Sequence, residues 1–364
     1  MIIHIDASRA LEPQPTGVNV YTREIIEHLV LCAAPDTQFI LYAPEWTKKN
    51  VPEFLKKFEN DSRVTWKFLR WPPKFLWTQI CLAWAWARAE KKDSVFFAPA
   101  HVAPFFTPRN TVVVIHDIAF EFLPDAFSWR ERMFARFMTR VNARVAKKIL
   151  VPSIETRDQL IARIKVPAEK IIVTPFALPC DAIKLSGEKL DRPPFILSVG
   201  RIEYKKGPDI LIRAFETLRS CGREIELVFV GKPGIGFETV DRLIQHSPYK
   251  QFIHVLGFVP DLGAFYASAR VLALPTRYEG FGFNFLEGMA VGVPVVGMSR
   301  GSVAEVAGDG VTLANDEKEF TDLLDRAISD DAFRADLISR GAERVKLFTW
   351  EKTAATTLDV LAKL

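Results

Sequence analysis

Residues 195–215 read FILSVGRIEYKKGPDILIRAF. An uncharged apolar run ends at Val199, Gly200 lets the chain turn, and a helical pattern begins at Pro208. Apolar residues follow one another in the first run instead of alternating with polar ones. That pattern is typical of a strand covered by helices on both faces. The stretch predicts strand, turn and helix, the unit of a parallel α/β sheet.

The same unit recurs along the whole chain. We expect strands at 2–5, 39–42, 95–97, 112–115 and 149–151, and again at 196–199, 227–230, 254–256, 271–274 and 294–297. Helical patterns lie between them, for example at 17–31, 130–146, 208–218 and 283–291. Because the alternation occurs twice, the sequence predicts an α/β fold of two Rossmann-like domains, each a doubly wound parallel sheet.

The boundary between the domains is expected within residues 177–194, a segment rich in proline that precedes a new strand. The predicted domains are 1–180 and 190–349, and the helix at 350–364 is free to cross back to the first domain. Open α/β sheets bind ligands at the carboxyl ends of their strands. Two such edges facing each other across a cleft would suit a substrate of two parts.

Composition narrows the class of protein. The 364 residues are 49% hydrophobic and 25% charged, as in globular proteins. The four cysteines are scattered and are expected to be small buried residues. The longest uncharged apolar stretch, 75–87, is shorter than the roughly 20 residues of a membrane-spanning helix, and the N-terminus lacks a signal pattern. We expect a cytoplasmic protein.

Two cations follow the strand that ends at Val199. Arg201 and Lys206 would project at its carboxyl end, where fixed positive charges can bind a diphosphate and stabilise it as a leaving group. A solvated basic loop is the alternative for this pattern taken alone.

A second loop, RYEGFGFNFLEGMAVGVPVV at 277–296, offers carboxylates and glycines. Gly280 and Gly282 permit close approach of the backbone to a ligand, and a helix from Phe283 would present its N–H groups to an anion. Glu279 precedes this helix and could face a sugar, whereas Glu287 could accept hydrogen bonds from a ribose. Two surface glutamates beside a turn are the alternative.

The first half contributes weaker signals. Gly17 begins a helix and could contact phosphate. The strand at 112–115 runs into His116 and Asp117, which could bind or orient a sugar, and His101 also follows a strand. A histidine with a purely structural role is the alternative.

No Asp-x-Asp sequence occurs, so a metal bound by paired carboxylates beneath a diphosphate is not expected. The charge is uneven: residues 1–180 hold 25 basic and 18 acidic side chains, and the rest hold 23 and 26.

Two segments of the first half, at 70–92 and 129–148, combine tryptophan with basic residues, and in the second Arg132, Arg136, Arg140 and Arg144 recur every four residues. An anionic membrane surface is one expected partner. A solvated basic face over an aromatic core remains the alternative, and no nucleic-acid motif is present.

Taken in order, VGRIEYKKGPDILIRAF, VLGFVPD, ALPTRYEGFGFNFLEGMAVGVPVV and FTWEKTA resemble retaining glycosyltransferases of family 4, which have the two-domain GT-B fold. TGVNVYTRE near the start and IHDIAF in the middle are similar to bacterial mannosyltransferases of polysaccharide assembly. The resemblance covers nearly the whole chain. It departs at Thr16 and at Asn19–Val20, where many relatives have glycine and Gly-Arg.

The resemblance implies a role for each matching residue. Arg201 and Lys206 would hold the donor diphosphate, Glu279 the sugar and Glu287 the ribose. Residues 280–283 (Gly280, Phe281, Gly282 and Phe283) would offer backbone N–H groups, Gly17 would approach the diphosphate, and His116 would lie beside the anomeric carbon. Asp117, His101 and Asn19 are the expected contacts on the sugar or acceptor side.

The implied reaction moves a hexose, with retention and without metal, from a nucleotide-sugar to a glycan or polyprenyl-diphosphate-linked acceptor. GDP-mannose is the donor that the clade implies, and a UDP-sugar is the alternative. Such an enzyme would be cytoplasmic, with peripheral contact at the inner face of the membrane left open. A Rossmann oxidoreductase would want G-x-G-x-x-G after the first strand, which is absent. A non-catalytic nucleotide-sugar binder would lack Arg201, Lys206 or Glu279.

Overall fold

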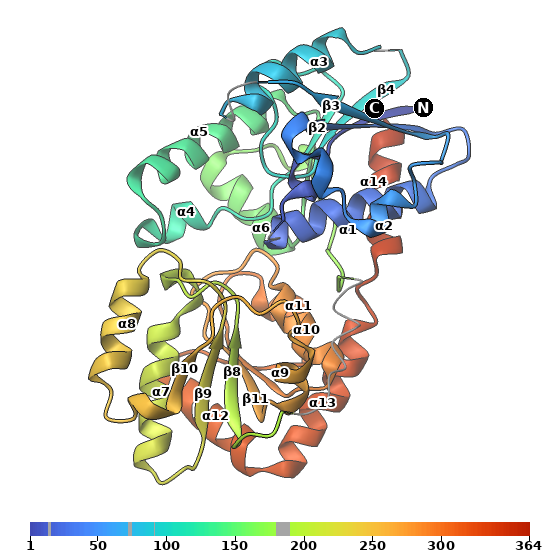
Figure 1. The fold of residues 1–364 in the computed structure, drawn as a ribbon. Helices are drawn as coiled ribbons and strands as arrows, with labels where there is room; N and C mark the ends of the chain where they lie inside the picture. Colours follow the sequence, from blue (N-terminus) through green and yellow to red (C-terminus); the bar gives the residue numbers. More distant parts are fainter. Residues whose placement is uncertain (14–15, 72–74, 91, 180–189) are drawn as a thin grey trace. The chain divides into compact units, whose positions relative to one another are not determined.

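The computed structural model describes residues 1–13, 16–71, 75–90, 92–179 and 190–364 (Figure 1). The chain packs as two compact units. Unit 1 contains residues 1–118, 133–179 and 349–364, and unit 2 contains 119–132 and 180–348. Residues 119–132 therefore pack with unit 2, although they lie within the range expected for the first domain. The linker expected at 177–194 falls mostly on 180–189, outside the described residues.

Unit 1 is built on a seven-stranded sheet in the order β3-β2-β1-β4-β5-β6-β7, and all its pairs are parallel. Its strands are β1 (Ile2–Asp6), β2 (Gln38–Pro44), β3 (Val64–Leu69), β4 (Ser94–Ala98), β5 (Thr111–Val114), β6 (Lys148–Val151) and β7 (Ile171–Val173). The two edge strands, β3 and β7, were not expected from the sequence. β3 alternates exposed and half-buried residues, because an edge strand is covered less completely, so it lacks the continuous apolar run of the inner strands.

Helices surround this sheet (Figure 1). They are α1 (Gly17–Cys32), α2 (Glu53–Lys56), α3 (Ala83–Arg88), α5 (Trp129–Val145), α6 (Ile154–Gln159) and α14 (Trp350–Ala362), with short turns η1 (Ser8–Leu11), η2 (Glu45–Asn50), η3 (Thr78–Leu82), η5 (Leu160–Ile164) and η6 (Ala168–Lys170). The final helix, α14, packs on α1 within unit 1. Its first residue, Trp350, donates through Nε1 to the carbonyl of Leu178 at 2.8 Å.

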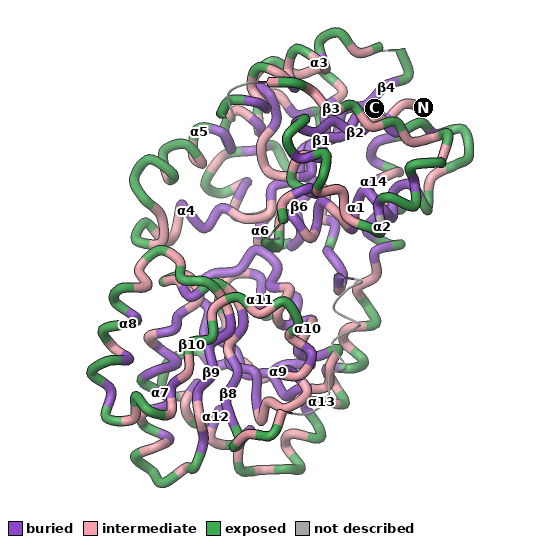
Figure 2. The backbone as a smooth tube through the Cα atoms, viewed as in Figure 1, coloured by how far each residue is buried: buried purple, intermediate pink, exposed green. Residues whose placement is uncertain are grey.

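Unit 2 contains a six-stranded parallel sheet in the order β10-β9-β8-β11-β12-β13. Its strands are β8 (Phe195–Val199), β9 (Glu226–Val230), β10 (Ile253–Val255), β11 (Val271–Leu274), β12 (Val295–Met298) and β13 (Thr312–Ala314). The four inner strands are buried along most of their length, whereas the edge strands β10 and β13 are only partly buried (Figure 2). The continuous apolar sequences of the inner strands reflect helix cover on both faces of the sheet.

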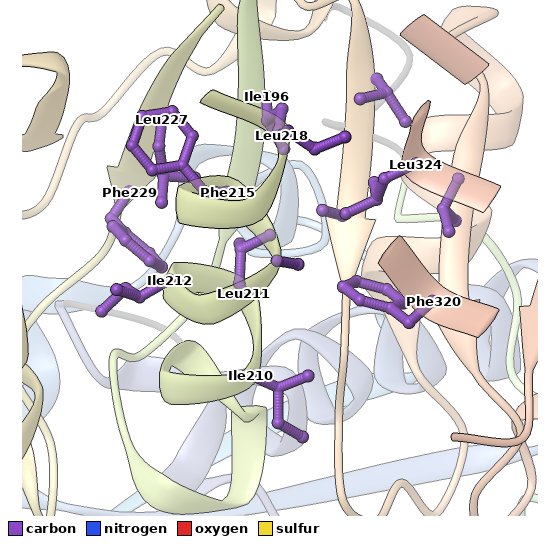
Figure 3. Packing of buried hydrophobic residues seen from close by; sticks show 14 of the residues in the cluster. Ile196, Ile210, Leu211, Ile212, Phe215, Leu218, Leu227, Phe229, Phe320 and Leu324 are labelled. Carbon is purple, nitrogen blue, oxygen red and sulfur yellow. The ribbon is translucent and has the colours of Figure 1, made fainter. Parts of the chain in front are cut away.

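One face of this sheet carries the core shown in Figure 3. Phe215 and Leu211 of α7 and Phe320 of α12 belong to this core, together with Phe229 of β9. The helices of unit 2 are α4 (Ala119–Phe122), α7 (Pro208–Ser220), α8 (Phe237–His246), α9 (Gly263–Ser268), α10 (Phe283–Val291), α11 (Val303–Ala307), α12 (Glu317–Ser329) and α13 (Asp331–Val345), with turns η4 (Pro124–Ala126), η8 (Tyr204–Lys206) and η9 (Lys250–Phe252).

Asp330 separates α12 from α13, and its side chain accepts from the Phe333 amide at 2.9 Å and so caps the start of α13. The expectation that the cysteines are buried is wrong for Cys32 and Cys221, which are exposed. None of the helices in the described residues combines the length and the hydropathy needed to cross a bilayer.

Candidate functional site

The two cations predicted to bind a diphosphate lie in the loop between β8 and α7. Lys206 ends the short turn η8, and its side chain is about one quarter exposed. Arg201 is half exposed and forms an ion pair with Glu203 at 3.5 Å. Strand β8 lies beside β11 in the sheet. The loop that carries the cations is therefore next to the loop that follows β11, because parallel strands end at the same sheet edge.

Arg277 holds these two loops together. Its guanidinium donates to both carboxylate oxygens of Asp209, at 2.8 and 2.7 Å, and to the carbonyl of Tyr204 at 2.8 Å. It also lies over the Tyr204 ring, 4.0 Å from the centroid. The backbone N–H of Arg277 donates to the carbonyl of Lys205 at 2.8 Å. This paired and stacked geometry suits arginine and not lysine.

Beside the Arg277–Asp209 pair, called here the clamp, the ammonium group of Lys206 lies against the carboxylate of Glu279. Lys206 Nζ lies 2.5 Å from Oε1 of Glu279, and the hydroxyl of Thr276 donates to the same oxygen at 3.2 Å. Glu279 is only 8% exposed. An ammonium group and a carboxylate are thus fixed together at the carboxyl ends of β8 and β11, one able to bind an anion and the other to accept from hydroxyls.

The backbone of Glu279 is supported by residues that the sequence did not single out. Both the amide and the hydroxyl of Ser302 donate to the Glu279 carbonyl at 3.0 Å. Gly301 lies against the same residue with φ of +60°, and a Cβ there would be 2.5 Å from the Glu279 carbonyl oxygen. Only glycine fits this close approach.

The glycine-rich turn after Glu279 leads into α10. Gly282 is the N-cap of that helix with φ of +88°, and a Cβ there would come within 2.8 Å of Phe285. Phe281 is buried and packs edge-on against Phe283 and Phe348. Its side chain therefore anchors the turn, which leaves the backbone of Gly280–Phe283 as the part suited to an anion at the start of α10.

Glu287 lies one turn into α10. Its Oε2 accepts from the hydroxyl of Tyr266 at 2.7 Å and from the amide of Asn284 at 3.4 Å. Burial raises the pKa of Glu287, and the Tyr266 hydrogen bond and the charge of Lys206 oppose that rise. The carboxylate is thus oriented by a neighbour on α9 and lies within the electrostatic influence of Lys206.

In unit 1, His116 follows β5. Its Nε2 lies 2.8 Å from the carbonyl of Pro99, which can only accept, so Nε2 carries the proton and Nδ1 can accept a hydrogen bond. The ring packs against Tyr21 and Phe176, with centroids 5.0 and 5.2 Å away. Burial lowers the pKa of His116 to about 4, and the imidazole is therefore neutral at pH 7.

The charge of Asp117 acts on His101, and the charge of His101 acts on His116. Burial lowers the pKa of His101, and the charge of Asp117 opposes that shift. Nε2 of His101 lies 3.1 Å from the hydroxyl of Thr139, and its backbone has φ of +68°. The amide of Asn142 also donates to its carbonyl. Thr139 and Asn142 both lie on α5, so two of the contacts of His101 are made with that helix.

The remaining two residues lie at the start of α1. Gly17 is exposed as the first residue of the helix. Asn19 is buried, and its Oδ1 accepts from both the amide and the hydroxyl of Thr16 at 2.8 and 2.6 Å. Its amide donates to the carbonyl of Arg9 at 2.9 Å. Asn19 thus holds the N-terminus of α1 in place. This structural role was not expected from the sequence, which predicted a contact on the sugar or acceptor side.

Among the described residues, one cluster has ligand atoms close enough to share a metal ion. It consists of Glu24, Glu27 and His28 on α1, with atoms within 4.8 Å of one another. Lys57 already neutralises Glu27, and the Nδ1 of His28 faces the carbonyl of Glu24 at 2.8 Å. The His28 ring stacks on Trp350. This cluster belongs to the packing of α1 on α14.

Two protein-family models match this chain, one in each half. Residues 15–181 match the family described as Glycosyltransferase Family 4, and residues 181–344 match Glycosyl transferases group 1. The chain belongs to glycosyltransferase family 4. Its two parallel α/β units are the GT-B fold, and the family makes it a retaining hexosyltransferase.

Two relatives of this glycosyltransferase differ in how much of the chain they match. O-antigen chain mannosyltransferase B of Escherichia coli is 27% identical over 98% of both chains. D-inositol 3-phosphate glycosyltransferase of a Nocardioides species is 34% identical, but over only 45% of this chain and 40% of its own length. The first relative covers both units and the second covers less than half of the enzyme.

Solved structures agree on the fold. Sucrose-phosphate synthase of Thermosynechococcus elongatus is 19% identical, with a TM-score of 0.74 over 100% of this chain and 98% of its own. WaaG, a glycosyltransferase of lipopolysaccharide biosynthesis, is 14% identical, with a TM-score of 0.70 over 99% of both chains. At these identities the likeness concerns the architecture of the glycosyltransferase alone.

The residues that support the loops carrying Lys206 and Glu279 were not predicted from the sequence. Asp209 and Arg277 lie 68 residues apart, so neither belongs to a local pattern. Ser302 and Gly301 carried a weak signal, because a Gly-Ser pair before a helix is typical of a turn and cap. Their support of Glu279 depends on the strand order, which brings β12 beside β11.

Proposed function

We propose that this enzyme transfers mannose from GDP-mannose, with retention, to a lipid-linked or polysaccharide acceptor in the cytoplasm. The observation that carries the assignment of the donor site is the Lys206–Glu279 pair beside the start of α10. The Escherichia coli relative, which aligns over 98% of both chains, supports mannose because it is named an O-antigen chain mannosyltransferase. A UDP-sugar donor is the alternative, favoured by a GT-B neighbour solved with UDP-glucose.

In the proposed reaction, the acceptor hydroxyl oxygen forms the new bond to the anomeric carbon while the bond from that carbon to the phosphate oxygen breaks. The hydroxyl proton passes to the leaving phosphate oxygen, on the same face of the sugar. Arg201 and Lys206 stabilise the negative charge that develops on the nucleoside diphosphate. No carboxylate needs to act as a nucleophile in this scheme.

The other residues bind and orient the donor. Glu279 accepts hydrogen bonds from sugar hydroxyls, and Glu287, oriented by Tyr266, accepts from the ribose. Gly17 and the backbone of Gly280–Phe283 contact phosphate and sugar.

His116 contributes a neutral Nδ1 that accepts from a sugar hydroxyl, with Asp117 beside it in the chain. Because the imidazole is uncharged at pH 7, His116 binds the sugar and does not supply positive charge.

A substitution at Lys206 tests the site. Lys206→Met keeps the aliphatic chain and removes the charge, and we expect turnover to fall by about 10²–10³, as for the loss of one charge-stabilising donor. Lys205→Met, one residue away in the same turn, makes the same change in net charge and should retain turnover within a few-fold. Wild-type turnover in Lys206→Met, in protein that unfolds at the wild-type temperature, would remove Lys206 from the mechanism.

Thermal shifts identify the donor. GDP, UDP, ADP and TDP and their sugar conjugates are added without metal, since a ligand that binds only the native state raises apparent stability. We expect a shift with GDP and GDP-mannose. A shift with UDP and its sugars alone would replace the donor and keep the class of reaction.

A further inference from the structure

We infer that unit 1 docks on an anionic lipid bilayer through a surface formed by η3–α3, the loop at 105–106 and the face of α5 from Met133 onward, called here the docking face. The inference deepens the proposed function and rests on it, because a lipid-linked acceptor would be presented at such a bilayer. Residues 72–74 and 91 border this region but lie outside the described residues and carry none of the argument.

The helical segment η3–α3 presents apolar side chains to solvent at helical spacing. Ile80 and Trp84 are exposed, whereas Leu82 and Trp86 on the opposite side are fully buried. The guanidinium of Arg88 lies 3.8 Å from the centre of the Trp84 ring. An indole stacked with a guanidinium is amphipathic, with a body that enters the headgroup region and a charge that remains at the phosphates.

Helix α5 repeats this arrangement. Its buried side includes Met138 and Asn142, and its outer side exposes Met133, Phe134 and Phe137. Phe137 is 56% exposed, and Trp84 on α3 is 59% exposed. Three large apolar side chains in five residues on the solvent side of one helix exceed the scattered exposure that ordinary surfaces show.

Two contacts join the segments into one surface. The side chain of Gln79 in η3 donates to the carbonyl of Ala103 at 3.1 Å and accepts from the amide of Phe105 at 2.8 Å. The ring of Phe105 packs edge-on against Phe137 of α5 at 5.7 Å. The next residue, Phe106, is 86% exposed. Figure 2 shows the exposed stretches on α3 and α5.

Charge decides what this apolar surface contacts. Within residues 78–88, 105–106 and 133–145, which make up the docking face, no residue is acidic and four are basic. The basic ones are Arg88, Arg136, Arg140 and Arg144. Exposed aromatic residues flanked by cations match a bilayer with anionic headgroups better than an apolar protein partner, which offers no negative charge to the cations.

The test is flotation of the full-length enzyme with vesicles of phosphatidylcholine alone and of phosphatidylcholine mixed with phosphatidylglycerol. We expect binding to the anionic vesicles and its loss at high salt. Trp84→Ser combined with Phe137→Ser should abolish flotation. Arg140→Gln combined with Arg144→Gln should weaken it by about 25-fold, from about fivefold for each cation near an anionic surface. Trp46→Ser, which removes an exposed tryptophan outside the docking face, should float like the wild type.

Equal binding to neutral and anionic vesicles would overturn the inference, as would wild-type flotation of the Trp84→Ser, Phe137→Ser variant. A concentration-dependent dimer that the same variant dissociates, without vesicle binding, would show a protein interface instead. The nucleotide thermal shift is measured on the wild-type enzyme beside its flotation. If the wild type gives the shift but does not float with anionic vesicles, the docking face is wrong and the donor site stands, whereas flotation without any nucleotide shift would reject the proposed function alone.

Discussion

The clamp between Arg277 and Asp209 gives the sharpest quantitative prediction. Both side chains are less than one fifth exposed, and the guanidinium makes two charge-assisted bonds to the carboxylate. Removing one member of a buried pair costs about 3–5 kcal/mol. Because Arg213 stays 3.1 Å from Asp209 and water reaches part of the pair, we expect Arg277→Ala to lower the free energy of unfolding by about 2–3 kcal/mol.

The measurement is urea denaturation followed by far-UV circular dichroism, with a thermal scan beside it. A loss of that size corresponds to a fall of about 5–10 °C in Tm for a unit of this length. Lys318→Ala is the matched control, since it removes one positive charge from an exposed i,i+4 pair with Asp322. Because an exposed ion pair adds little to stability, that variant should unfold at the same urea concentration as the wild type, within error.

The pH dependence provides an independent check. Burial by itself would raise the pKa of Asp209, but the hydrogen bonds and charges of Arg277 and Arg213 outweigh burial and lower it. A carboxyl with a lowered pKa in the folded state adds stability above its unfolded pKa of 3.8, and that stability is lost as the pH falls through the folded pKa. The difference between wild type and Arg277→Ala should be constant from pH 5 to 8, roughly, and shrink below about pH 4. If Arg277→Ala unfolds like Lys318→Ala, the clamp does not hold the loops.

Three further substitutions test other contacts. Gly301→Ala should lower the free energy of unfolding by about 1–3 kcal/mol and reduce transfer, because the new Cβ would press on the Glu279 carbonyl, and denaturation with an activity assay measures both. His116 has a folded pKa of about 4, below its unfolded value of 6.5, so unit 1 should lose stability as the pH falls from 6.5 to 4, and urea titrations of His116→Asn should show a weaker loss. Trp350→Phe removes the bond to the Leu178 carbonyl and should cost about 1 kcal/mol in equilibrium unfolding, whereas no change would show that α14 is held by packing alone.

Much of the fold could be predicted from local sequence patterns. The inner strands of both sheets were predictable because they are covered on both faces and therefore read as uninterrupted apolar runs, as in β5 and β11. The edge strand β3 lacked that signal because its partial exposure permits polar residues, and β7 and β13 are only three residues long. Residues 119–132 pack with unit 2 although they lie between segments of unit 1 in the sequence. Their membership could not be predicted, because it depends on packing and not on position in the chain.

At the proposed donor site, local sequence patterns were enough to identify the available chemical groups: the cations Arg201 and Lys206, the carboxylates Glu279 and Glu287, and the turn that starts α10. These are identifiable because each follows a strand, where parallel sheets place their functional side chains. Which of these groups contact one another depends on the packing of the whole chain. Lys206 and Glu279 are 73 residues apart, and they pair because β8 and β11 are neighbours in the sheet and Arg277 joins their loops. Such contacts depend on strand order, a property of the packed core that no local pattern contains.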